Sequence, residues 1–349
     1  METQIRKLDY EAIDMNTIEE AGRVLKEGGL VAFPTETVYG LGGDALNPAS
    51  SEKIYAAKGR PSDNPLIVHI AEKADVYRIA EEVPEQAERL MEAFWPGPLT
   101  LIFPKKDLVP DKTTGGLSTV AVRMPSDKIA AAFIRAAGGF VAAPSANASG
   151  RPSTTTAAHV AEDLNGRIEM ILDGGQAVIG LESTIVDVSG DFPVILRPGV
   201  ITGTMIEAVI GPVETDRAVI APDSHVRPKA PGMKYRHYAP RASLTIVEGE
   251  AAAVIAAVNE LTAKAEAEGK RVGIIAADET AGCYERGLVR SLGARSREEE
   301  ISRHLFEVLR GFDETDVDCI YSESFGDAAI GQAIMNRLLK AAGHRVVRV

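Results

Sequence analysis

The feature that most constrains the fold is a regular alternation of short apolar runs with longer stretches of helical character. The apolar runs predict strands at residues 30–33, 66–70, 99–103, 119–123, 140–143, 168–172, 185–188 and 194–197. Apolar periodicity, caps and terminal glycines predict helices at residues 17–27, 51–57, 84–95, 127–137 and 156–164, with a further helix opened by Thr202. Interleaved strands and helices predict an α/β fold on a twisted, mixed sheet.

A second series of strands and helices follows residue 242. Strands are predicted at residues 243–247, 271–276, 318–321 and 345–349, and helices at 250–268, 296–311 and 328–342. This βαβ order predicts a small, parallel, Rossmann-like sheet. The chain has no Gly-x-Gly-x-x-Gly fingerprint and no Walker phosphate loop. We therefore expect the second domain to regulate or support catalysis rather than to bind a dinucleotide.

The two series are separated by a stretch of unusual composition. Residues 225–241 contain five Lys or Arg residues, three prolines and no carboxylate, in a chain whose formal net charge is -12. Prolines at this density are typical of a semi-rigid linker. The predicted domains are therefore 1–212 and 243–349, joined by a basic linker at 213–242. A basic, tyrosine-bearing linker can close over a nucleotide as a lid, and an inert tether is the alternative.

Cysteine content, hydropathy and charge exclude several classes of protein. Only Cys283 and Cys319 are present, which excludes a disulfide framework and a Cys-rich zinc module. No apolar run approaches the roughly 18 residues of a membrane span, and the N-terminus is too polar for a signal peptide. We expect a cytoplasmic protein with no membrane partner. The acidic net charge opposes strong direct binding to nucleic acid.

A basic turn supplies the first candidate binding residues. Lys58 and Arg60 are one residue apart in a turn bounded by Gly59, Pro61 and Pro65. Lysine contributes a compact charge and arginine a planar fork that can hold two oxygens, so the pair predicts a phosphate clamp. A solvated basic turn is the alternative.

Two loops and a strand end supply further candidates. Residues 144–153 are mostly Ser, Ala, Asn and Gly after an apolar strand, and residues 34–43 form a loop rich in Thr and Gly. Both kinds of loop allow close approach to a ligand, and both also serve as plain connectors. Strand alternation places Thr119 and Arg123 on one side, where Arg123 could grip a carboxylate or emerge into solvent. His69 could be functional or a buried core histidine.

Several of these motifs together resemble one family. Lys58-x-Arg60, Ser145-x-Asn147 and residues 33–41 resemble the YrdC-type family of L-threonylcarbamoyladenylate synthases, and residues 231–240 with the following domain resemble its longer, two-domain members. The resemblance implies that L-threonine, bicarbonate or carbon dioxide, and ATP give L-threonylcarbamoyl-AMP, pyrophosphate and water. This is the first step of the N6-threonylcarbamoyladenosine modification of tRNA, which a separate transferase completes. Such displacement at phosphorus needs positioning and charge neutralisation, with Mg²⁺ bridging the phosphates.

The resemblance also implies roles for individual residues. The residues expected to act at the reacting phosphate are Lys58, Arg60, Ser145 and Asn147. The residues expected to bind ATP are these four together with Asn64, Thr119, Ser153, Arg197, Tyr235 and Tyr238. The residues expected to surround threonine are Thr37, His69, Arg123, Ala143 and Ser183, with Arg123 pairing with the carboxylate. The sequence does not indicate which residues hold the metal.

Two other functions remain open at this stage. An RNA-binding regulatory module would use the basic linker with Lys58 and Arg60, although Trp95 is the only tryptophan and no aromatic-rich platform is evident. A carbamoyl-adenylating enzyme would use a similar domain, but relatives of that kind resemble larger chains with Cys-rich zinc modules, which two cysteines cannot supply.

Overall fold

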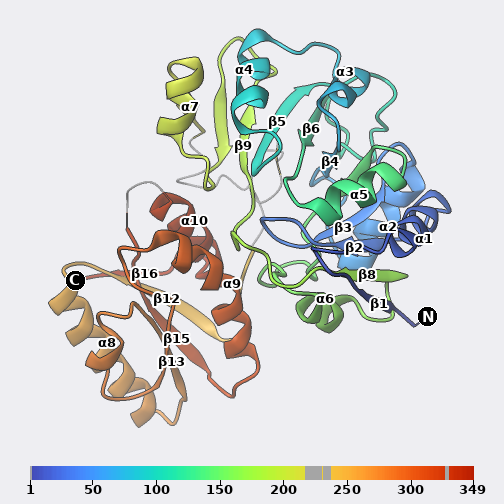
Figure 1. Ribbon diagram of the computed structural model, residues 1–349. Coiled ribbons are helices and arrows are strands. Elements are labelled where there is room, and N and C mark those ends of the chain that lie inside the picture. Colours follow the sequence, from blue (N-terminus) through green and yellow to red (C-terminus); the bar gives the residue numbers. More distant parts are fainter. Residues whose placement is uncertain (1, 217–229, 231–236, 327–329) are drawn as a thin grey trace. The chain divides into compact units, whose positions relative to one another are not determined.

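The computed structural model describes residues 2–216, 230, 237–326 and 330–349, and Figure 1 shows its elements. The chain divides into two compact units. The first comprises Met1–Ser149, Ser153–Val178 and Glu182–Tyr235, and the second comprises Gly150–Pro152, Ile179–Leu181 and Arg236–Val349. A mixed sheet in the first unit and a parallel sheet in the second confirm the predicted fold class. None of the helices in the described ranges combines the length and apolar character that a membrane span requires.

The first unit is built on a mixed sheet. Among the described residues its order is β1-β8-β2-β3-β7-β4-β6-β5-β9-β10-β11. The strands are β1 (Gln4–Lys7), β2 (Val31–Phe33), β3 (Gly40–Asp44), β4 (Ile67–His69), β5 (Leu99–Pro104), β6 (Thr119–Arg123), β7 (Val141–Ala143), β8 (Met170–Asp173), β9 (Thr184–Asp187), β10 (Val194–Arg197) and β11 (Glu214–Thr215).

Helices cover this sheet on both faces. They are α1 (Met15–Lys26), α2 (Pro48–Lys58), α3 (Val76–Ile79), α4 (Glu85–Phe94), α5 (Lys128–Ala136), α6 (Ala157–Leu164) and α7 (Gly203–Ile210), with a 3₁₀ turn η1 (Lys73–Asp75). Apolar side chains of α1 and α5 pack with alternate residues of β2, β7 and β8. The other residues of these strands pack with α2, α4 and α6. Strand alternation therefore produces two separate cores, one on each face.

Two local predictions in this unit were wrong. Helix α2 was predicted to begin at residue 51, but it begins at Pro48 and is capped by Asn47, whose side chain accepts from the amide of Ala49. Residues 34–43 were expected in a loop, but residues 40–43 belong to β3, which pairs with β2 and β7. Glycine suits this crowded strand because a Cβ on Gly42 would lie 2.9 Å from Val141 Cγ1.

The second unit contains an all-parallel sheet in the order β14-β13-β15-β12-β16. Its elements are β12 (Ser243–Glu248), α8 (Ala251–Ala267), β13 (Val272–Ala276), η3 (Ala281–Cys283), β14 (Leu288–Ser291), α9 (Glu298–Asp313), β15 (Cys319–Glu323), α10 (Gly331–Ala341) and β16 (Val346–Arg348). The prediction of a parallel sheet is confirmed. The edge strand β14 was not predicted, because it is partly exposed and not uniformly apolar.

Two short segments of the second unit come from far earlier in the chain. The Arg310 guanidinium donates to the Pro152 carbonyl at 2.7 Å, and the Ser302 hydroxyl donates to the Ile179 carbonyl at 3.0 Å. Gly180 adopts a φ of +80°, and a Cβ there would lie 2.5 Å from Arg303 Cα. Helix α9 thus holds the residues that directly precede Ser153 and Glu182 in the chain.

Candidate active site

One face of the first sheet gathers several of the predicted site residues. Arg123 on β6 is in register with His69 on β4 and Thr100 on β5. Residues paired across neighbouring strands project to the same side, and the period of two adds Thr119 to that side. Ala143 on β7 pairs with the residue two places before His69 and so also lies there. Four of the predicted residues therefore share one face, and Thr100 joins them unpredicted.

Helices α1 and α5 pack on the part of this face formed by β2, β7 and β8. The adjoining part, over β4, β6, β5 and β9, carries a smaller apolar cluster of Ile67, Ile102, Ala121, Ile185, Leu196 and Ala230. Ala230 belongs to the predicted linker and is fully buried in this cluster. At least one linker residue therefore packs directly beside the candidate site.

At the end of β6 lies a buried charge pair. Arg123 Nη2 is 2.8 Å from Glu36 Oε1, and the two side chains are only 5% and 10% exposed. Burial and the positive charge of Arg123 lower the pKa of the neighbouring His69 to about 3. His69 is therefore neutral at physiological pH, and its Nδ1 lies 3.2 Å from the Ile67 carbonyl. Arg123 does not emerge into solvent, which excludes that alternative.

The two motifs that define the family resemblance meet through one ammonium group. Lys58, at the end of α2, is buried, and its Nζ donates to the carbonyls of Ser145 and Asn147. The Ser145 hydroxyl donates to Asn147 Oδ1 at 2.5 Å, and the amide of Ser149 donates to the Lys58 carbonyl at 2.9 Å. Lys58 is therefore not part of a solvated turn.

The second cation of the basic turn, Arg60, bonds to backbone carbonyls of the same turn. The Arg60 guanidinium donates to the carbonyls of Asn64 and Pro65 at 3.3 and 3.1 Å. Asn64 is buried, and its Oδ1 accepts no hydrogen bond from the described residues. Gly115, at φ +61°, lets another loop approach so closely that a Cβ would lie 3.1 Å from the Asp63 carbonyl.

A second polar group combines residues predicted for two different ligands. Arg197 donates through Nε to the Ser183 carbonyl at 3.0 Å and through Nη2 to the Ser183 hydroxyl at 3.1 Å. That hydroxyl is 2.8 Å from the Thr100 hydroxyl. The adjacent Ser153 hydroxyl donates to Glu182 Oε1 at 2.5 Å. The structure therefore brings together Ser183, which was predicted for threonine, and Arg197, which was predicted for ATP.

The remaining predicted residues are distributed more widely. Thr37 is fully buried, with its hydroxyl 2.9 Å from that of Thr35. Tyr238 belongs to the second unit, where its ring packs 5.2 Å from that of Phe306. Tyr235 lies outside the described residues.

The residues that sequence reasoning missed are Glu36, Thr100 and Glu182. Glu36 and Glu182 each neighbour a predicted residue, but a carboxylate in a loop gives no signal of burial. No group of three or more His, Cys, Asp or Glu side chains that could hold a metal occurs within the described residues.

Family models match both parts of the chain. Residues 23–199, more than half of the chain, match the model of the Sua5/YciO/YrdC family, whose description is "Telomere recombination". The chain belongs to this family. Residues 201–343 match a second model, described as "Threonylcarbamoyl-AMP synthase, C-terminal domain". The predicted resemblance to two-domain members is thereby confirmed.

Full-length relatives of the family support the same assignment. The chain is 51% identical over 332 residues to the threonylcarbamoyl-AMP synthase of Bacillus subtilis, covering 95% of this chain and 94% of that protein. It is 50% identical over 339 residues to that of Pyrococcus abyssi, covering 97% and 98%. The crystal structure of P. abyssi Sua5 complexed with L-threonine superposes with a TM-score of 0.94 at 49% identity, covering 99% of this chain and 100% of that one.

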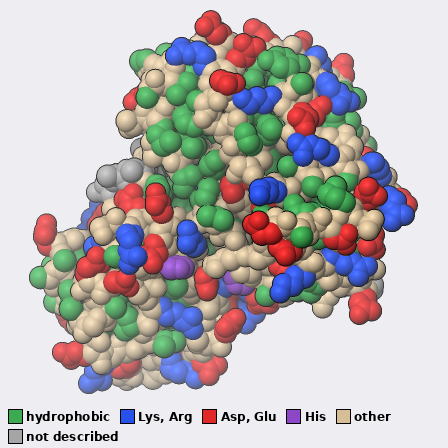
Figure 2. Space-filling view, in the orientation of Figure 1, with side chains coloured by type: hydrophobic (Ala, Val, Ile, Leu, Met, Phe, Trp, Pro, Cys, Tyr) green, Lys and Arg blue, Asp and Glu red, His purple; other side chains and the backbone are tan. Residues whose placement is uncertain are grey.

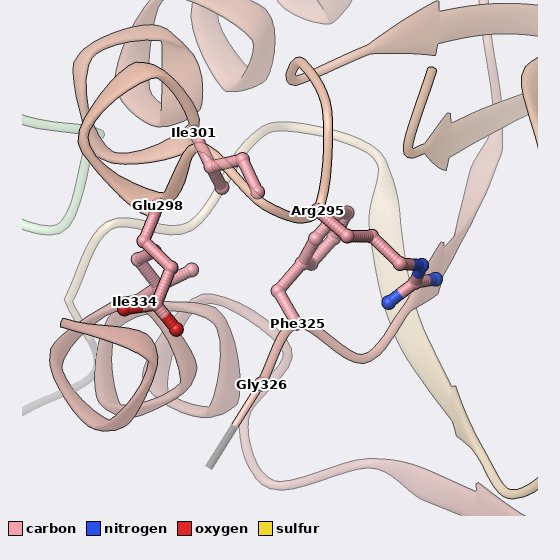
Figure 3. A pocket seen from close by; sticks show the side chains of 6 residues that line it. All are labelled: Arg295, Glu298, Ile301, Phe325, Gly326 and Ile334. Atoms are coloured by element: carbon pink, nitrogen blue, oxygen red, sulfur yellow. The ribbon is translucent and has the colours of Figure 1, made fainter. Parts of the chain in front are cut away.

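The second unit has a cavity of about 130 Å³ beyond the carboxyl end of β15, lined by Arg295, Glu298, Ile301, Phe325, Gly326 and Ile334 (Figure 3). In Figure 3 the Arg295 guanidinium points away from Glu298. Both charged groups already have partners, because Arg295 pairs with Glu323 and Glu298 accepts from the amide of Ile330 at 3.0 Å. This cavity therefore offers a ligand no free charge among the described residues.

Proposed function

We propose that this chain makes L-threonylcarbamoyl-AMP from L-threonine, bicarbonate or carbon dioxide, and ATP, with release of pyrophosphate. The predicted synthesis of threonylcarbamoyl-AMP is supported by the family models and by the names of the full-length relatives. The product would pass to a separate transferase that modifies tRNA. A cytoplasmic location is part of this proposal.

We assign the nucleotide to the group formed by Lys58, Ser145 and Asn147. The single observation that supports this most strongly is the Lys58 ammonium, which donates to two carbonyls of the Ser145 loop. A cation fixed in this way needs no reorganisation when charge develops on a triphosphate. Arg60, Asn64, Thr119, Ser153 and Arg197 would complete the nucleotide site, with Tyr235 and Tyr238 contributed by the linker region.

We assign L-threonine to the neighbouring end of the same sheet face. Arg123 would receive its carboxylate, with Thr37, His69, Ser183 and the backbone of Ala143 around it. The P. abyssi protein was crystallised with L-threonine, which supports this substrate. The carbamate formed from the threonine amine would attack the α-phosphorus in line as pyrophosphate leaves, so the chain's task is to align the two substrates.

Magnesium would be held mainly by the substrate. Mg²⁺ keeps several waters and is commonly bound through substrate phosphates with one or two carboxylates. When bound, it would neutralise charge on the phosphates.

The linker at 213–242 is proposed as a lid, because exclusion of water protects a reactive mixed anhydride. Its support is the burial of Ala230 beside the site. Cleavage of the chain between Ala221 and Ala230 would test this, since unaltered synthesis would favour a tether.

The test of the proposed function is pyrophosphate release by the full chain with ATP, L-threonine and bicarbonate, each omitted in turn. We expect Lys58→Ala to lower the rate by about 100-fold or more, the scale of a lost electrostatic contact at a reacting centre. Arg60→Ala is a second variant that spares the buried ammonium. Lys53→Ala is the matched control, because Lys53 lies on the same helix and bonds to the Gly28 carbonyl. Normal release by both site variants would contradict the assignment.

The alternatives are tested in the same experiment. Release that needs neither threonine nor bicarbonate but requires an added carbamoyl donor would favour a carbamoyl-adenylating enzyme. For RNA binding, Figure 2 shows acidic and basic side chains interspersed over the visible face, without a continuous basic patch among the described residues there. Salt-sensitive binding of RNA without pyrophosphate release would favour the regulatory module.

A further inference from the structure

The ion pair between Glu36 and Arg123 is buried but poorly bonded. Neither oxygen of Glu36 accepts a hydrogen bond from any residue that the structure describes, and Arg123 Nη2 donates none to the described residues. The two charges are in contact at 2.8 Å, yet no N–H of the guanidinium is directed at the carboxylate. Buried polar groups are normally hydrogen-bonded, so this exception needs an explanation.

The surroundings of Glu36 contain one cation and two carboxylates. The second carboxylate, Asp127, is fully satisfied, because it accepts from the Tyr10 hydroxyl and, at 2.8 Å, from the amide of Ala130. His69, which faces Arg123 from β4, is neutral. Asp127 therefore needs no further donor, whereas Glu36 is short of hydrogen-bond donors among the described residues.

We propose that Glu36 and Arg123 together form a receptor for a free amino acid, in which Arg123 takes the carboxylate and Glu36 takes the ammonium. The proposal rests on the proposed function, because it refines how L-threonine is held. A zwitterion carries no net charge, so its entry replaces one buried ion pair by two without adding charge to the site. Three N–H donors of an ammonium would also satisfy the carboxylate oxygens that the folded chain leaves without donors.

The arrangement predicts a specific discrimination. A ligand with a carboxylate but no amine would displace Glu36 from Arg123 and leave the Glu36 carboxylate buried and unpaired. Sites built to bond a polar group reject analogues that lack it, because the partner in the site then stays unsatisfied. Glu36 would thus select free amino acids over hydroxy acids of the same shape.

The test compares two ligands by calorimetric titration of the full chain: L-threonine, and 3-hydroxybutanoate, which keeps the carboxylate and hydroxyl but lacks the amine. We expect the wild type to prefer threonine by about 100-fold or more. Glu36→Gln should reduce that preference by about tenfold or more. It should weaken the binding of threonine, whereas 3-hydroxybutanoate should bind at least as tightly as it does to the wild type. Glu36→Asp should keep part of the preference and serves as the second variant if Glu36→Gln does not fold.

Glu323→Gln is the matched control, because it removes a buried carboxylate that pairs with an arginine in the second unit and should leave the preference unchanged. An unchanged preference in Glu36→Gln would overturn the inference. Tighter binding of both ligands would overturn it too, since Glu36 would then be only a competitor for Arg123. A wild type that binds no threonine would instead overturn the proposed substrate, whatever the variants do.

Discussion

Each unit holds a buried carboxylate that pairs with an arginine. In the first unit Glu36 pairs with the buried Arg123, and in the second Glu323 pairs with Arg295, whose side chain is 38% exposed. Glu323 is 1% exposed and accepts from the hydroxyls of Thr280 and Tyr284 as well as from Arg295. Glu36 is almost as deeply buried and accepts no hydrogen bond among the described residues. Burial and charge therefore do not by themselves distinguish a structural carboxylate–arginine pair from a binding site. The number of hydrogen bonds that the carboxylate oxygens accept does distinguish them.

The largest loss of activity is expected from a change at Arg123. We expect Arg123→Ala to reduce kcat/KM for threonine by about 1,000-fold, because it removes the carboxylate anchor and leaves Glu36 buried without a counter-charge. Steady-state pyrophosphate release against threonine concentration measures the effect. Full activity in this variant would place threonine elsewhere.

The opposite result is expected at Glu323. Glu323→Ala should lower the unfolding free energy by about 2–4 kcal/mol, because the buried hydroxyls of Thr280 and Tyr284 lose their acceptor. Trp95 is the only tryptophan and lies in the first unit, so its fluorescence reports that unit while circular dichroism reports both. We expect the urea transition followed by dichroism to shift more than the fluorescence transition, with threonine affinity unchanged. Weakened threonine binding would erase the contrast between the two pairs.

A smaller effect is expected from pH at His69. Its pKa in the folded chain is lowered to about 3, below the ordinary value of 6.5, so the unfolded chain binds more protons between these values. Stability from this residue is therefore complete above about pH 6.5 and is lost as pH falls toward 3. We expect protonation of His69 in the unfolded chain to lower the free energy of unfolding of the first unit by about 2 kcal/mol between pH 7 and pH 5. Urea unfolding followed by Trp95 fluorescence measures this change. His69→Asn should lack this component, and an identical loss in that variant would refute the cause.

The sequence predicted the fold well where local chemistry decides it. Thr202 opens a helix as expected, and apolar runs such as Val194–Arg197 form strands. Prediction from the sequence was less successful where packing against a neighbouring element decides the role of a residue. Residues 50 and 51 have the composition of a cap but are buried within α2, where the Ser51 hydroxyl lies 2.9 Å from that of Thr113. Residues 40–43 have loop composition but form part of a strand, where glycine fits because a Cβ on Gly42 would lie 2.9 Å from Val141 Cγ1 of the adjoining strand.

By itself, the sequence determined the strand and helix alternation, the family motifs and the separation of the two domains' patterns, since periodicity and spacing are properties of the linear chain. Only the tertiary structure decided which polar groups meet. Lys58 reaches the Ser145 loop 87 residues away, and Glu36 meets Arg123, because sheet pairing brings together segments whose spacing in the chain carries no record of that contact. Burial then set the charge states, because desolvation depends on everything packed around a group.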